Sequence, residues 1–178
     1  MPIMLMPIML ATPVRRIICA AAVILGATVV TAPARGQDGG IAVGAHPPAA
    51  AVQSLDGKPA DLSGIVGSGP TVIEFWATWC PNCKQLEPAL AAAQSKYAGR
   101  VRFVTVAVAI NESIERVRKH VAVHPIGGTV VFDASGNAAS AYDAPATSYV
   151  VIIDRTGRVV YTGVGGTQDI DAAIHKAI

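Results

Sequence analysis

The distribution of apolar residues predicts two central strands joined by a helix in the middle of the chain. Residues Thr71 to Trp76 form a compact run of β-branched and aromatic side chains, which is typical of a strand. Val101 to Ile110 is mostly apolar at successive positions, so we expect a strand that is covered on both faces. Between these runs, apolar residues recur every three or four positions and predict a helix that buries Leu86, Leu90, Ala93 and Tyr97.

The same pattern predicts hairpins near both ends of the remaining chain. Asp56 and Gly57 lie between two short strand-like runs, which indicates a first hairpin. Turns are expected at residues 133–136 and 154–157, and the second of these joins the last two strands. The turns separate three further strands, which we expect at residues 129–132, 149–153 and 158–164.

Two more helices follow from capping residues and apolar spacing. We expect Asn111 to cap a helix whose inner face consists of Ile114, Val117 and Val121. Thr167 is expected to cap a terminal helix that buries Ile170, Ala173, Ile174 and Ala177. The order of strands and helices predicts an α/β fold with a mixed central sheet, helices on both faces and an N-terminal β-hairpin extension.

The first 34 residues differ in composition from the rest. Arg15 and Arg16 precede an apolar stretch that is followed by Ala-Pro-Ala, an order typical of a secretory signal peptide cleaved after Ala34. The apolar stretch, residues 17–30, is shorter than the roughly 20 residues of a membrane-spanning helix, so an uncleaved membrane anchor is the alternative. We therefore divide the chain into a signal peptide (1–34), a flexible lead-in (35–51) and one domain (52–178).

Charge and cysteine content narrow the function further. Removing residues 1–34 takes away two arginines and no acidic residue, so the net charge falls from +2 to zero. No basic patch indicates nucleic-acid binding. Only Cys80 and Cys83 remain after cleavage, because Cys19 lies within the apolar stretch. One close cysteine pair in a domain large enough for its own core is available for chemistry, and we expect a monomer.

The segment Trp79-Cys80-Pro81-Asn82-Cys83 is the strongest chemical signal in the chain. Two cysteines separated by two residues at the start of a helix can form a disulfide, and the helix dipole stabilises the first sulfur as a thiolate. A thiol pKa lowered from about 8.5 to roughly 3.5–7.5 makes a nucleophile near neutral pH. We expect Cys80 to be the accessible attacking thiol and Cys83 the resolving thiol.

Together with the predicted order of elements, two stretches resemble the thioredoxin superfamily, in particular the exported TlpA/ResA-like thiol:disulfide oxidoreductases. They are VIEFWATWCPNCKQLEP (72–88) and YVVIIDRTGRVVYTG (149–163). The resemblance implies a thioredoxin fold, a periplasmic location and disulfide exchange without a cofactor. It implies partners outside the cytoplasm that carry disulfides or dithiols, such as cytochrome c apoproteins, and a membrane or periplasmic electron donor.

The resemblance also assigns roles to residues around the cysteines. Glu74 corresponds to a buried acid beneath the active-site disulfide, and its apolar strand is expected to raise its pKa. We hypothesise that it accepts the proton of Cys83, directly or through water. Trp79 corresponds to the aromatic residue that shields the disulfide, and Pro81 and Asn82 fill the variable positions that tune the redox potential. These three are expected substrate contacts.

One feature departs from the family pattern. Relatives place a cis-proline before the strand that leads to the Asp-x-x-Gly turn, whereas this chain has Ser148 there. We expect the Thr147–Ser148 peptide to be trans, because a non-proline cis bond costs about 2.5–4 kcal/mol. The loop can still present backbone groups to an extended partner, so we assign Thr147 and Ser148 to substrate binding.

Two alternative functions remain open at this point. The first alternative is a protein that binds Cu(I) through the two thiolates. A zinc site would normally need four ligands, and two cysteines supply only half of them. We assign no metal site. His120 and His124 are interpreted as a surface pair. Residues 149–157 also resemble the peroxiredoxin group, which leaves a peroxidase as the other alternative. We favour a reductase of partner disulfides, while the direction of electron flow depends on the redox potential.

Overall fold

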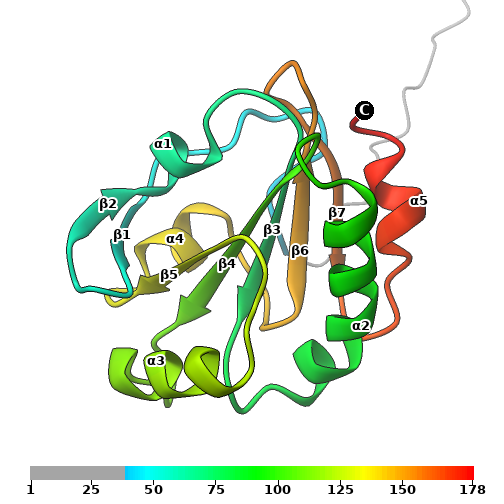
Figure 1. The fold of residues 1–178 in the computed structure, drawn as a ribbon. Helices are drawn as coiled ribbons and strands as arrows, with labels where there is room; N and C mark the ends of the chain where they lie inside the picture. The colour runs from blue at the N-terminus through cyan, green and yellow to red at the C-terminus, as the bar shows by residue number, and fades with distance from the viewer. Residues whose placement is uncertain (1–38) are drawn as a thin grey trace, which may run out of the picture. The chain divides into compact units, whose positions relative to one another are not determined.

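A computed structural model describes residues 39–178 of the chain as a mixed α/β domain, and the predicted signal peptide lies outside these residues (Figure 1). The described part contains seven strands: β1 (Ala51–Ser54), β2 (Pro59–Asp61), β3 (Thr71–Trp76), β4 (Arg102–Val108), β5 (Thr129–Asp133), β6 (Tyr149–Ile153) and β7 (Val159–Val164). It also contains five helices: α1 (Leu62–Val66), α2 (Pro81–Lys96), α3 (Ile114–Val123), α4 (Asn137–Ala141) and α5 (Ile170–Ile174).

All seven strands form one sheet in the order β2-β1-β5-β4-β3-β6-β7. The strand β4 runs parallel to β3 and β5, whereas β6 and β7 are antiparallel to their neighbours. The β1–β2 hairpin turns at Asp56 and Gly57, where Gly57 has a φ of 80°, and β1 extends the sheet by pairing with β5. The mixed sheet and its N-terminal hairpin extension are therefore confirmed.

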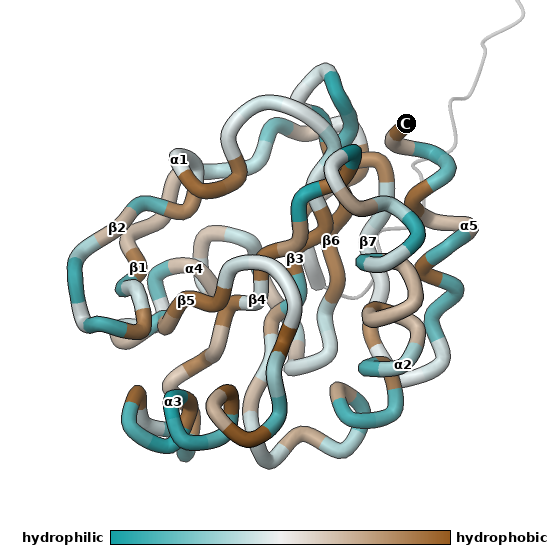
Figure 2. Tube along the Cα trace, viewed as in Figure 1, coloured by the Kyte–Doolittle hydropathy of each residue, from teal (hydrophilic) through white to brown (hydrophobic). Residues whose placement is uncertain are grey.

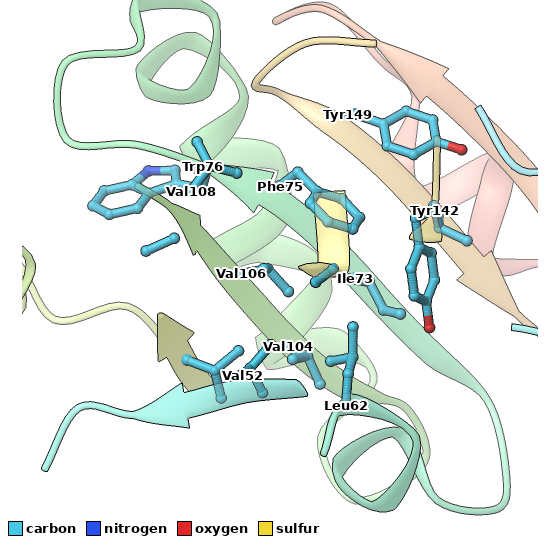
Figure 3. Close-up of a cluster of buried hydrophobic side chains, with 14 of the residues drawn as sticks. Val52, Leu62, Ile73, Phe75, Trp76, Val104, Val106, Val108, Tyr142 and Tyr149 are labelled. Atoms are coloured by element: carbon cyan, nitrogen blue, oxygen red, sulfur yellow. The ribbon is translucent and has the colours of Figure 1, made fainter. Parts of the chain in front are cut away.

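The alternation of side chains along the central strands divides the core between the two faces of the sheet. Ile73 and Phe75 belong to a cluster that includes residues from α1, α3 and α4. Figure 3 shows Phe75 beside Tyr142 and Tyr149, whose ring centroids lie 5.5 and 5.7 Å from that of Phe75. Val72 belongs to the second cluster, with α2 and α5. The helices thus cover both faces.

The central position of β3 and β6 follows from their composition. All six residues of β3 and all five of β6 are buried. In Figure 2, β6 is hydrophobic (brown) along its length. Burial on both faces explains why these strands consist of continuous apolar runs and why a polar residue within β3 stands out. That residue is Glu74.

Two predicted helix caps are wrong by two residues each. Ser113, not Asn111, caps α3, and its Oγ accepts a hydrogen bond from the N–H of Arg116 at 3.2 Å. Asn111 instead adopts a left-handed φ of 49° in the turn before the helix. Asp169, not Thr167, caps α5, because its carboxylate accepts from the N–H of Ala172 at 2.9 Å. A carboxylate is also favoured by the dipole at a helix N-terminus.

Part of the predicted flexible lead-in packs on the domain. The N–H of Gly44 donates to the carbonyl of Val159, which in turn donates its N–H to the carbonyl of Ala45. The N–H of Ile41 donates to the hydroxyl of Tyr149 at 2.9 Å. The ordered domain therefore begins before residue 52. Within residues 39–178, no helix combines the length and hydrophobicity that a membrane crossing requires.

Candidate active site

The two cysteines form a disulfide at the N-terminus of α2, where β3 delivers the chain. Cys80 is the N-cap residue and Pro81 is the first helical residue, where its missing N–H costs no hydrogen bond. The Cα atoms of Cys80 and Cys83 lie 5.3 Å apart, and the N–H of Cys83 points at the Cys80 sulfur at 3.1 Å. In the reduced protein, this N–H and the helix dipole would stabilise a thiolate on Cys80.

The disulfide is buried beside an outer cavity rather than on an open surface. Cys80 is only 4% exposed, which is less than we expected of an accessible thiol. It lines a cavity of about 170 Å³ whose wall carries Thr78, Lys84, Glu87, His120 and His124. Cys83 is 1% exposed and does not line this cavity. The cavity reaches only the sulfur to which the sequence assigned the attack.

Glu74 is a buried carboxyl group in the middle of β3, with 5% of its surface exposed. Its Oε1 has no hydrogen-bond partner within the described part of the protein. Burial, and to a smaller extent the charge of Glu87, raises the pKa of Glu74 to about 8. A carboxyl with this pKa can release and accept a proton near neutral pH.

Glu74 and Cys83 both line an inner cavity of about 70 Å³. Its polar wall includes Glu87, Gln94, Thr105 and His120. This volume is large enough for water, which needs about 10–15 Å³ and several polar partners. Glu74 and Cys83 therefore line one cavity that has room for water.

Three of the predicted substrate contacts lie at the surface around the disulfide. Trp79 is 45% exposed, and its indole N–H donates to the carbonyl of Ile110 at 2.8 Å. Pro81 and Asn82 are exposed on the first turn of α2. The helix continues through Pro88 to Lys96. Trp79, Pro81 and Asn82 flank Cys80 in the sequence, and their exposed side chains are partly apolar and partly polar.

Ser148 and Thr147 differ in burial and in whether their backbone N–H and C=O groups are hydrogen-bonded. Ser148 is fully buried, with a φ of 64°, and no peptide bond in residues 39–178 is cis. Its N–H donates to the carbonyl of Phe75, and its carbonyl accepts from Gly165 and from the Gln168 side chain. Thr147 is half-buried, and its backbone groups make no hydrogen bond within the described domain. Of these two residues, only Thr147 has backbone groups without a hydrogen-bond partner in the described domain.

The sequence interpretation missed three acidic or basic residues near the disulfide. Glu87 and His120 line both cavities, and Glu112 accepts hydrogen bonds from Thr78, two residues before Cys80. Spacing along α2 places Glu87 one turn after Cys83, which was a usable signal. His120 and Glu112 approach from a distant segment, so no local pattern marks them.

The histidine pair lies closer to the site than a surface interpretation suggests. The rings of His120 and His124 have centroids 4.9 Å apart, and His120 lies 5.2 Å from the Trp76 ring. Across residues 39–178, no three His, Cys, Asp or Glu side chains are arranged to hold a metal ion.

This combination of sheet order, Cys-x-x-Cys disulfide and buried acid defines a thioredoxin-fold thiol:disulfide oxidoreductase. The chain belongs to the Redoxin family, whose family model matches residues 42–177. It is a redox enzyme of the protein-disulfide oxidoreductase type and is TlpA/ResA-like within the thioredoxin superfamily.

Individual relatives support this assignment. The thiol-disulfide oxidoreductase ResA of Bacillus subtilis is 30% identical over 149 residues, which cover 84% of this chain and 79% of ResA. The thioredoxin-like protein YneN of the same organism is 28% identical over 71% of this chain and 74% of YneN. The crystal structure of a thioredoxin-family thiol:disulfide interchange protein from Chlorobium tepidum matches with a TM-score of 0.61 and 26% identity. That match covers 77% of this chain and 98% of the other.

Proposed function

We propose that this protein is exported and reduces disulfides of partner proteins through the Cys80–Cys83 couple. The observation that carries the proposal is a disulfide whose first sulfur lines the outer cavity while its second sulfur shares the inner cavity with Glu74. This arrangement separates the place of attack from the place of proton transfer. It suits two-step thiol–disulfide exchange.

In the first step, the Cys80 thiolate attacks one sulfur of the partner disulfide. A bond forms between Cys80 Sγ and that sulfur while the partner S–S bond breaks, and the second partner sulfur leaves as a thiolate that takes a proton from water. The N-terminus of α2 stabilises the thiolate before the attack.

In the second step, Cys83 resolves the mixed disulfide. The Glu74 carboxylate takes the Cys83 proton, and the Cys83 thiolate then attacks Cys80 Sγ and expels the second partner thiolate. Two electrons have passed from the dithiol to the partner, and Glu74 holds one proton. A pKa of about 8 in the disulfide form favours that protonated state at neutral pH. When a donor dithiol reduces the protein again, Glu74 returns this proton to Cys83.

Partner binding is assigned to the surface that surrounds Cys80. The free backbone groups of Thr147 can pair with an extended chain by strand-type hydrogen bonds. Trp79, Pro81 and Asn82 offer exposed side chains for the residues that flank the partner cysteine. Ser148 shapes this loop from the interior and does not contact the partner. Export is supported by the composition of residues 1–34.

A trapping experiment tests this function directly. Cys83→Ser leaves the attacking thiol but removes the resolving thiol, so mixed disulfides through Cys80 should accumulate in the extracytoplasmic fraction. Cys80→Ser is the matched control and should trap nothing. If Cys83→Ser forms no mixed disulfide, the proposed exchange is wrong.

The reduction potential decides the direction. A value below about −200 mV for the Cys80/Cys83 couple supports a reductant, whereas a value near −120 mV would contradict this direction and support disulfide donation. Titration of the reduced protein with Cu(I), against a variant lacking both thiols, and a peroxide-consumption assay address the two alternatives. Tight copper binding or peroxide turnover without disulfide exchange would overturn the proposal.

A further inference from the structure

A second buried carboxylate lies beside the active site, and the exchange mechanism described so far gives it no task. Glu112 belongs to residues 110–113, which form most of the loop between β4 and α3, and its side chain is 0% exposed. An acidic side chain is rarely buried completely unless it is paired with hydrogen-bond donors. Its partners therefore indicate why it is there.

The donors come from both sides of Glu112. Its Oε2 accepts from the backbone N–H of Thr78 at 2.9 Å and from the Thr78 hydroxyl at 2.5 Å. Its Oε1 accepts from the N–H of Ser113 at 3.1 Å and lies 3.5 Å from Nη1 of Arg116. The carboxylate thus joins the segment before Cys80 to the start of α3.

Further hydrogen bonds fix the same two segments relative to each other. The Trp79 indole donates to the carbonyl of Ile110 at 2.8 Å. Arg116 Nη1 donates to the carbonyl of Asn111 at 2.7 Å, which braces the loop from α3. Residues 78 and 79 are therefore held at two consecutive positions by the 110–113 loop.

This attachment determines where Cys80 lies. Thr78 is two residues before Cys80, and the N–H of Cys80 closes the intervening turn by donating to the carbonyl of Ala77 at 3.1 Å. We infer that Glu112 is a positioning residue, which holds the Thr78–Trp79 segment so that the Cys80 sulfur faces the outer cavity in line for attack on a partner disulfide. The inference rests on the proposed function.

The chemistry of the site explains why a carboxylate is required. All of its partners are donors, and a carboxylate is the side chain that only accepts. Glutamine has nearly the same shape, but its NH₂ group would face at least one of these donors. Glu112→Gln therefore loses at least one of these hydrogen bonds with little change in volume. Thr78→Val removes the hydroxyl from the other side and leaves the backbone N–H in place.

The test compares these variants in the full mature protein. We expect Glu112→Gln to lower the second-order rate of insulin disulfide reduction about tenfold, because small displacements of a reacting group cost up to about a hundredfold in rate. Thr78→Val should lower it severalfold. The double variant should be no slower than Glu112→Gln alone, because both substitutions break one interaction.

Two controls separate positioning from folding and from charge. Glu115→Gln removes an exposed negative charge from the same region and should retain the wild-type rate. Thr78→Ser keeps the hydroxyl and should lose less of the rate than Thr78→Val. Alkylation of the Cys80 thiolate by iodoacetamide, at its high-pH plateau, should change less than twofold in Glu112→Gln, because a small reagent needs no defined approach. All rates are compared below the melting temperature of each variant.

Several outcomes would overturn the inference. Glu112→Gln could melt at a lower temperature yet reduce insulin at the wild-type rate, which would make Glu112 structural only. Additive losses in the double variant would show that the carboxylate does not act through Thr78. If Glu112→Gln does not fold, a wild-type rate in Thr78→Val decides against it. Inactive wild-type protein would instead contradict the proposed function, and every control would then be inactive too.

Discussion

Glu74 is a carboxyl group that is buried among apolar residues, where its charged form is unfavourable. It lies between the apolar residues Ile73 and Phe75 in a strand that is buried along its whole length, and one of its oxygens has no partner. Such a group is costly when charged, and therefore its pKa rises toward neutrality. The same cost underlies the proton-carrier role that we propose for it toward Cys83, with which it shares a cavity.

We expect Glu74→Gln to slow the resolution of mixed disulfides by about a hundredfold or more, the usual contribution of a general base. Glutamine preserves the shape of the side chain but cannot take the Cys83 proton. Stopped-flow measurement of single-turnover exchange would separate this step from the attack by Cys80, which should keep its rate. The pH dependence of resolution should also lose the ionisation that Glu74 contributes in the wild type. An unchanged resolution rate with an unchanged pH profile would exclude the proton-transfer role.

The sequence predicted the place of some residues of the candidate site but not of others. Cys80 and Cys83 follow from local spacing at the start of a helix, whereas Glu74 follows from the resemblance to thioredoxin-like proteins and from its apolar neighbours. Glu112 could not be predicted, because its contact with Thr78 joins segments 34 residues apart. Ser148 was placed at the correct loop position, but its burial depends on hydrogen bonds to Phe75 and Gly165, which no local pattern encodes.

Among the elements, α4 is a short helix whose cap comes from outside the usual N-cap position. The five residues of α4 carry no apolar repeat, and Gly136 at the N-cap position has no side chain to cap the helix. The cap is supplied instead by Asp133 at the end of β5. Its buried carboxylate accepts from the N–H groups of Ala138 at 3.1 Å and Ala139 at 2.8 Å. The sequence predicted only a turn at 133–136, since a cap supplied from four residues before the helix is invisible in a pattern of apolar residues.

Asp133→Ala should therefore destabilise the domain by about 2–3 kcal/mol, because it leaves one buried and one partly buried N–H group without an acceptor. Urea unfolding of the oxidised protein, monitored by tryptophan fluorescence, gives the free energy of unfolding. Asp133→Asn keeps one acceptor oxygen and should lose less. Equal stability of wild type and Asp133→Ala would show that α4 does not need this cap.

At the scale of the whole domain, the strands of the sheet were more predictable from the sequence than the segment that packs against its edge. The continuous apolar run of residues 101–110 identifies β4 as central, and the turn residues identify the β6–β7 hairpin and the β1–β2 hairpin. The docking of residues 41–45 on β7 was not predicted, because it uses backbone hydrogen bonds from a Gly- and Ala-rich segment. Backbone hydrogen bonds do not depend on the type of side chain, so the pattern of apolar and polar residues does not reveal them.

The raised pKa of Glu74 also links the stability of the whole domain to pH. Its ordinary pKa is 4.5, and its pKa in the folded domain is about 8. Between these values the folded state holds a proton that the unfolded state has released. Stability should therefore fall as pH rises through this window, by up to about 1.4 kcal/mol per pH unit from this group, and level off above pH 8.

The difference between wild type and Glu74→Gln isolates this contribution, because all other titrating groups are shared. Urea unfolding of the oxidised proteins from pH 4 to 9 should show a wild-type curve that descends relative to Glu74→Gln. Glu87→Gln removes the neighbouring charge that helps to raise the pKa of Glu74, so its descent should end at a lower pH. Parallel curves for wild type and Glu74→Gln would mean that Glu74 titrates alike in the folded and unfolded states. It could then not hold, in the disulfide form, the proton that it takes from Cys83.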